Sequence, residues 1–160
     1  MPVFMKAGSI EGDVVAAAYR GWVEIDSCSF EVKFDEDDVR KSVGDGAPEP
    51  SLEPFEIKKS VADRSGPSFL QWMVDGTEMP TVQIDVCGDT VFGDGWRCAM
   101  RYTLKKVVLR DYTMSMTDGE KGTFTITMQL EYQELGMEQI SYDKVGAERT
   151  RTRSSVHART

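Results

Sequence analysis

The segment FEIKKSVADRSGPSFLQWMVDGTEMPTVQIDV, residues 55–86, decides the fold that the sequence predicts. Its two ends alternate apolar and polar side chains, with the period of a strand that buries one face. Between them, residues 67–75 are a helix candidate, because Pro67 suits a first helical turn and Gly76 suits a left-handed end. The segment therefore reads as strand, helix, strand. The apolar stripe predicted for the helix consists of Phe69, Leu70, Met73 and Val74.

The rest of the chain adds strands, and no other segment reads so clearly as a helix. Residues 124–132 form the least ambiguous strand, with apolar side chains at the even positions and polar ones at the odd positions. The phase of the alternation changes near Lys105, and it also changes near Asp26, where we expect a β-bulge or a bend. The predicted fold class is mainly β, a compact two-sheet β-barrel with one short α-helix.

Two charged segments stand apart from this pattern. The extended acidic loop, residues 35–53, holds seven acidic and two basic residues, and residues 144–160 hold five basic and one acidic. We expect one domain over residues 1–160, with a barrel core at 1–142 and a basic C-terminal extension at 143–160. We also expect this loop and this tail to lie at subunit or ring boundaries. The residues predicted to make these contacts are Asp35, Glu36, Asp37, Asp38, Arg149, Arg151 and Arg153. The alternative is that the tail folds back as an extra strand on its own barrel.

Composition limits the classes of function. With a net charge of −8, the chain lacks the basic surface that nucleic acids require. It has no run of 18 apolar residues, so no membrane insertion is expected. The first residues are too polar for a signal peptide, which predicts a cytoplasmic protein. The three cysteines, with no CxxC motif, are predicted to be reduced and buried.

The sequence offers no constellation of residues that would carry a reaction. The only histidine, His157, lies in the tail, which is a poor place to hold a catalytic base. Phosphate-binding, dinucleotide-binding and zinc-protease motifs are missing. We therefore predict that the protein is not an enzyme and that it needs no cofactor or metal.

Three stretches in consistent order resemble the haemolysin-coregulated protein (Hcp) family, the tube subunit of the type VI secretion system. They span about 140 residues, and each motif is weak when taken alone. The matching motifs are MKAGSIEG (5–12) with GWVEI (21–25) and CSF (28–30), then FEIKK (55–59) with GPSFL (66–70) and VQI (82–84), then residues 102–115 with VVL (107–109) and YTMS (112–115).

The resemblance implies an assembly role. It implies homo-hexameric rings that stack into a tube inside a contractile sheath, with a spike protein at the tip and effector proteins in the lumen. It also implies that Ser29 faces the lumen and contacts cargo. Such a tube subunit is cytoplasmic before firing and is then exported by the secretion machine itself. A closed ring would also cover the edges of the predicted sheets.

Two other functions compete with this one. The first is a monomeric β-barrel that binds a small ligand in its interior. The inward side chains predicted by the alternation, such as Ile126 and Met128, would fill such an interior and leave little room for a ligand. The second is a tube subunit that has become an effector, for which 160 residues leave no room for a catalytic domain.

Overall fold

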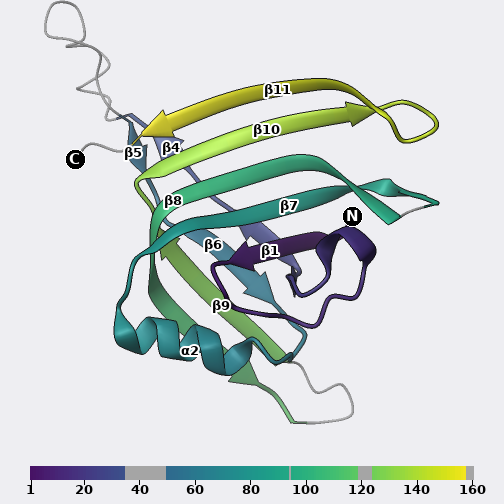
Figure 1. Cartoon of the computed structure of the whole chain (residues 1–160). Coiled ribbons are helices and arrows are strands. Elements are labelled where there is room, and N and C mark those ends of the chain that lie inside the picture. The colour runs from purple at the N-terminus through teal and green to yellow at the C-terminus, as the bar shows by residue number, and fades with distance from the viewer. Residues whose placement is uncertain (35–49, 94, 119–123, 158–160) are drawn as a thin grey trace, which may run out of the picture.

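The computed structural model describes residues 1–34, 50–93, 95–118 and 124–157, and for Asp89 the backbone alone. It confirms a mainly β protein with one α-helix (Figure 1). The elements are β1 Val3–Ala7, a 3-10 turn η1 Ala17–Tyr19, β2 Val23–Ile25, β3 Ser27–Ser29, β4 Val32–Lys33, β5 Ser51–Leu52, β6 Phe55–Lys59, α2 Gly66–Asp75, β7 Met79–Phe92, β8 Gly95–Met116, β9 Phe124–Glu131, β10 Glu134–Tyr142 and β11 Glu148–His157.

Strand β8 belongs to two layers and joins them. Its first part lies between β7 and β10 in a six-stranded layer, in the order β2-β1-β7-β8-β10-β11. Its second part pairs with β9 in a four-stranded layer, in the order β8-β9-β6-β3. Between these parts lies Lys106, the one non-glycine residue with positive φ (54°) in the described chain. The predicted change of phase near Lys105 is therefore confirmed, and it marks the passage of β8 from one layer to the other.

The core lies between the two layers and the helix. Val82, Ile84 and Leu104 of the six-stranded layer and Phe55 and Ile57 of the four-stranded layer are all completely buried. They belong to one apolar cluster that also contains side chains of α2. Burying a large apolar side chain contributes about 1.5–3 kcal/mol. As expected, these inward positions form a packed interior.

The bend predicted at Asp26 is confirmed. It separates β2 from β3, and its amide donates a hydrogen bond of 2.8 Å to the carbonyl of Lys58. Because β2 ends the strand path in one layer and β3 ends it in the other, the chain crosses between the layers here. The path of paired strands is nevertheless open, and among the described residues no pairing closes it into the predicted barrel.

The helix begins and ends as the sequence predicts, but its buried face differs. Pro67 lies in its first turn, and Gly76 ends it with φ of 62°. Phe69 and Trp72 are buried, whereas Leu70 is 52% exposed and Val74 is 73% exposed. The predicted stripe is thus wrong for Leu70 and Val74, because successive residues turn by about 100° and only one side of the helix packs against the core.

The C-terminal segment is an ordered strand of the same chain. Strand β11 pairs antiparallel with β10 over its whole length (Figure 1), so the alternative in which the tail folds back is the observed one. Among the described residues, no helix is long and apolar enough to cross a membrane.

Candidate functional site

The outer face of the four-stranded layer is mostly polar. The alternation that buries Phe55, Ile57 and Met128 turns every second side chain away from the core. These outward residues are Ser27 and Ser29 of β3, Glu56 and Lys58 of β6, Thr125, Thr127 and Gln129 of β9, and Asp111, Thr113 and Ser115 of β8. We call this set the polar face.

Strand register aligns the polar face into rows. Ser29 lies opposite Glu56, which lies opposite Gln129, which lies opposite Asp111. The next row consists of Ser27, Lys58, Thr127 and Thr113. Side chains in a row are near neighbours on one surface, so four strands present one continuous wall of hydroxyl, amide and charged groups.

The charges on this wall are sparse and solvated. Lys58 Nζ lies 3.7 Å from Glu56 Oε1, and their side chains are 54% and 34% exposed. An ion pair this exposed contributes about 0–1 kcal/mol. A surface of this kind can offer many weak hydrogen bonds to a passing polypeptide while lacking an apolar anchor.

Both edges of this layer are unpaired within the described chain. Strand β3 pairs only with β6, and residues 108–116 of β8 pair only with β9. An uncovered edge carries a row of backbone donors and acceptors that can pair with another strand. The polar face is therefore bounded by two strand edges that have no partner strand within the described chain.

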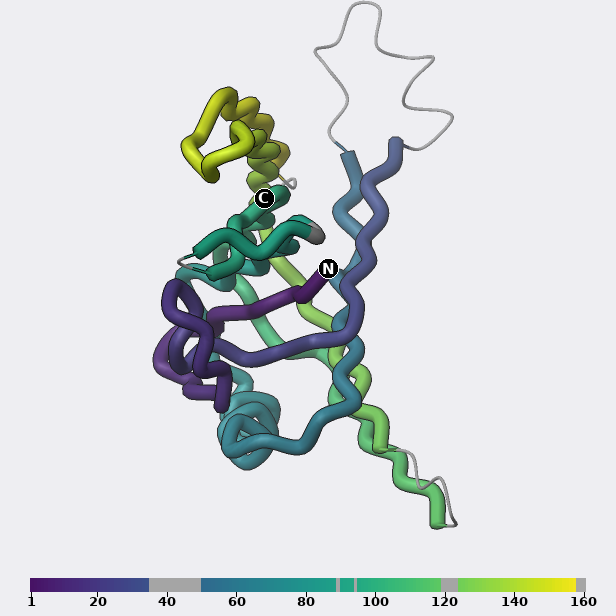
Figure 2. Tube along the Cα trace, turned by 90° about the vertical axis from the view of Figure 1, so that its right-hand side faces the viewer, coloured from purple at the N-terminus to yellow at the C-terminus, as the bar shows by residue number. Residues whose placement is uncertain are grey.

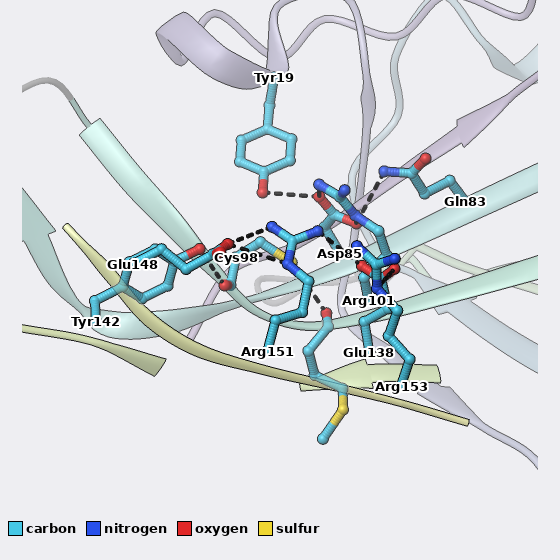
Figure 3. Close-up of polar contacts among 11 residues, drawn as sticks. Tyr19, Gln83, Asp85, Cys98, Arg101, Glu138, Tyr142, Glu148, Arg151 and Arg153 are labelled. Carbon is cyan, nitrogen blue, oxygen red and sulfur yellow. Dashed lines mark hydrogen bonds and ion pairs between the residues drawn. The ribbon is translucent and has the colours of Figure 1, made fainter. Parts of the chain in front are cut away.

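A different arrangement covers the outer face of the six-stranded layer. Asp85 of β7 is completely buried there, beneath the N-terminal segment that contains η1. It accepts hydrogen bonds from Tyr19 Oη at 2.9 Å and from Gln83 Nε2 at 3.2 Å. Arg101 adds a two-pronged contact, with Nε at 2.9 Å and a terminal nitrogen at 3.0 Å (Figure 3). We call Asp85, Tyr19, Gln83 and Arg101 the buried carboxylate cluster.

Burial and pairing in this region shift several pKa values. Burial, reinforced by the charge of Asp85, raises the pKa of Tyr19. Hydrogen bonding to Asp85 raises the pKa of Arg101, which therefore stays charged. Burial raises the pKa of Cys98 to about 12 and also raises that of Cys87. These thiols are protonated at neutral pH and hence poor nucleophiles.

The arginines of β11 extend the cluster into a charged row. Cross-strand register places Asp85 beside Arg101, Arg101 beside Glu138, and Glu138 beside Arg153. The carboxylate of Glu138 contacts Arg153 Nε at 2.8 Å and an Arg151 nitrogen at 3.1 Å (Figure 3). Signs alternate along this row across four strands, which ties β11 to its own sheet.

The residues predicted from sequence fall in three different places. Ser29 is exposed on the polar face. Arg151 and Arg153 find carboxylates within their own chain, while exposed Arg149 has no ion pair among the described residues. Asp35, Glu36, Asp37 and Asp38 lie outside the described residues.

Sequence reasoning missed the partners of Ser29 and the role of Asp85. The outward position of Gln129 was readable from the alternation of residues 124–132, but its place beside Glu56 depends on register. The alternation at the end of residues 55–86 predicts that Asp85 faces solvent, which is wrong because the segment that contains η1 covers it. No local signal in the sequence indicates that the segment containing η1 packs over Asp85.

Within the described residues, the fold and the polar face define the class of protein. It is a mainly β domain with one α-helix, one polar sheet face and two unpaired strand edges. The family model described as type VI secretion system effector, Hcp, matches residues 4–143. The chain therefore belongs to the Hcp family of type VI secretion proteins. Among curated proteins, none matches the chain.

Solved structures of related proteins share the fold. A type six secretion system protein superimposes with a TM-score of 0.77 at 17% identity, covering 94% of this chain and 91% of that chain. A type VI secretion system effector from Yersinia pestis gives 0.71 at 12% identity, with 98% and 99% covered. Hcp1 from Salmonella typhimurium gives 0.71 at 13% identity, with 98% and 93% covered. At these identities the likeness bears on the fold alone.

Proposed function

We propose that this chain is a structural, non-catalytic subunit of the type VI secretion inner tube. Copies form hexameric rings, and the rings stack into a tube that a contractile sheath expels behind a spike protein. The lumen carries effector proteins. The chain resides in the cytoplasm until firing and leaves the cell with the tube.

One observation carries this proposal: the polar face is bounded by two unpaired strand edges. If the β8 edge of one copy pairs with the β3 edge of the next, six copies close a ring by head-to-tail contacts. The polar faces then form a continuous inner wall, and the six-stranded layers lie outside it.

Ser29 lies beside the β3 edge on this wall, which suits a cargo-contacting position. The small side chain of Ser29 leaves space in the lumen for a folded effector, whereas a longer side chain would reduce that space. We expect Ser29→Gln to keep the ring and to reduce retention of lumen cargo in co-purification. Thr152→Gln, an equally exposed change on β11, is the matched control and should retain cargo normally.

The charged segments support contacts between copies. Each copy carries a net charge of −8, so rings repel one another at low salt. Arg149 is exposed on β11, and we expect it to meet carboxylates of an adjacent chain, including Asp35, Glu36, Asp37 and Asp38. Arg151 and Arg153 would share their own-chain partners with that neighbour. Each exposed pair would contribute about 0–1 kcal/mol.

Native mass measurement tests the proposal. A ring of six has six times the chain mass of 17.9 kDa. Backbone pairing of strand edges is little affected by salt, so we expect the ring mass at both 0.1 M and 1 M NaCl. A monodisperse species of single-chain mass at micromolar concentration would refute the proposal.

A further inference from the structure

The four-stranded layer projects beyond the core at both ends (Figure 2). At one end, the β8–β9 hairpin extends past the body of the protein near α2. Its outward side belongs to the polar face, but its other side is apolar and uncovered. On that side Met114 is 46% exposed and Met116 is 72% exposed.

A groove runs between this hairpin and the first turn of α2. It encloses about 410 Å³, and its walls are almost entirely apolar. Leu70 and Pro67 form the helix side, and Tyr112, Met114 and Phe124 form the hairpin side. The wall residue Leu70 is half exposed, because it lies away from the side of α2 that buries Phe69 and Trp72.

The two charged residues that line the groove are buried and paired with each other. Lys59 and Asp63 form an ion pair of 3.1 Å with side chains only 1% and 5% exposed. Lys59 also donates to the carbonyl of Glu24 at 3.2 Å, and Asp63 accepts from the amide of Ser65 at 2.9 Å. With these polar groups satisfied inside the chain, the groove offers an occupant chiefly apolar contact.

The opposite end of the same layer carries a complementary projection. The short β4–β5 ribbon extends β3 and β6 away from the core on the side opposite the β8–β9 hairpin (Figure 2). Val32 and Phe34 are 38% and 46% exposed. They continue the alternation of Cys28 and Phe30, so they lie on the core side of the layer, as the groove does.

We propose that the groove is a docking surface for a second copy of this chain, which inserts Val32 of its β4 and Phe34, the next residue after that strand. The four-stranded layer and the separate β4–β5 ribbon that extends from it thus carry two different uncovered apolar ends, which is the requirement for repeated head-to-tail contact along the strand direction. This inference rests on the proposed tube, and it assigns the groove to the contact between successive rings. Burial of the two side chains would supply the apolar attraction that offsets repulsion between acidic rings.

Leu70→Asp tests the groove, and Val15→Asp is its matched control. Both replace an exposed apolar residue by a charge, and Val15 is 84% exposed and does not line the groove. We expect Leu70→Asp to keep the native mass of the ring and to raise at least tenfold the concentration at which rings stack, as seen by sedimentation and negative-stain imaging. Val15→Asp should stack as the unmodified chain does. Phe34→Asp should reproduce the loss from the other side of the contact.

A cysteine pair tests the identity of the occupant. In a chain carrying Phe34→Cys and Leu70→Cys, oxidised glutathione should link copies into species larger than six chains on a denaturing gel. The pair Val15→Cys and Leu70→Cys should not form this cross-link.

Stacks that form without the Phe34–Leu70 cross-link, or stacks that survive Leu70→Asp unchanged, overturn the docking proposal without contradicting the proposed ring. A Leu70→Asp variant whose native mass falls below that of the ring would place the groove in the contact between subunits of one ring, and this result also overturns the docking proposal. Unmodified rings that never stack overturn it as well, whereas an unmodified chain that is a monomer refutes the tube itself.

Discussion

The outer faces of the two layers are encoded by the same alternating pattern, but their outward side chains differ in exposure to solvent. On the four-stranded layer the outward residues, such as Ser29 and Gln129, remain open to solvent. On the six-stranded layer the outward Asp85 is sealed by the segment that contains η1 and held by Arg101. A polar residue on an open face contributes little to stability, while a sealed carboxylate makes the fold depend on its partners. The open face is thus free to serve binding, and the covered face holds the domain together.

The largest difference in stability between variants of the two faces is expected when the side chain of Arg101 is removed. The change Arg101→Ala leaves the buried carboxylate of Asp85 without its cation, so we expect a loss of about 3 kcal/mol in the free energy of unfolding. Urea denaturation measures this. Arg110→Ala, which removes an exposed pair of 3.3 Å with Glu131, is the control and should cost about 0–1 kcal/mol. Equal losses for the two variants would contradict the distinction between the faces.

Alkaline pH should also act on the covered face. The pKa of Cys98 is raised to about 12, so the folded chain keeps its proton while the unfolded chain releases it. Stability is therefore complete below about pH 9 and falls as the pH rises toward 12, by about 1.4 kcal/mol per pH unit for this thiol. Tyr19, whose pKa is also raised by burial, acts in the same direction. We expect Cys98→Ala to unfold with a shallower dependence on pH between 9 and 11, and an identical slope would count against the shift.

A smaller loss is expected for Tyr19→Phe. This change removes one of the hydrogen bonds to Asp85 and leaves the ring packed against Phe4, whose centroid lies 4.6 Å away. A hydrogen bond to a charged group contributes about 1.5–3 kcal/mol, and Arg101 still pairs the carboxylate, so we expect a loss near 1.5 kcal/mol. Thr127→Val on the polar face should change stability by less than about 0.5 kcal/mol. Hydrogen exchange in the η1 segment should accelerate only in the Tyr19 variant.

The smallest effect on stability is expected for Ser29→Gln. The side chain is exposed and makes no side-chain hydrogen bond with the residues that the structure describes, so the free energy of unfolding should move by less than about 0.5 kcal/mol. Cargo retention should nevertheless fall. A loss of stability comparable to that of Tyr19→Phe would show that Ser29 is structural.

Local patterns sufficed to predict much of this fold. The alternation of residues 124–132 gave the buried and open faces of β9, and Pro67 with Gly76 bounded the helix to within one residue. The breaks of phase at Asp26 and Lys105 located the two places where the chain changes layer. These features are encoded within a few residues of each other, so a single sequence displays them.

Contacts between distant segments could not be predicted in the same way. Asp85 looks like Gln83 in the alternation, and only the packing of η1 separates a buried charge from a wet side chain. Leu70 and Val74 carry the helical period, but the sequence does not state which side of α2 meets the sheet. The own-chain partner of Arg153 could not be predicted either, because it follows from the strand register that places Arg153 beside Glu138. Long-range geometry decided each of these positions.

Imaging of the assembled chain by electron cryomicroscopy tests the central claim most directly. We predict a six-membered ring in which Ser29, Glu56, Gln129 and Asp111 face the central channel and the β3 and β8 edges of neighbouring copies pair. A ring whose polar face points outward, a ring whose copies meet through the six-stranded layer, or a chain that remains single would contradict the claim.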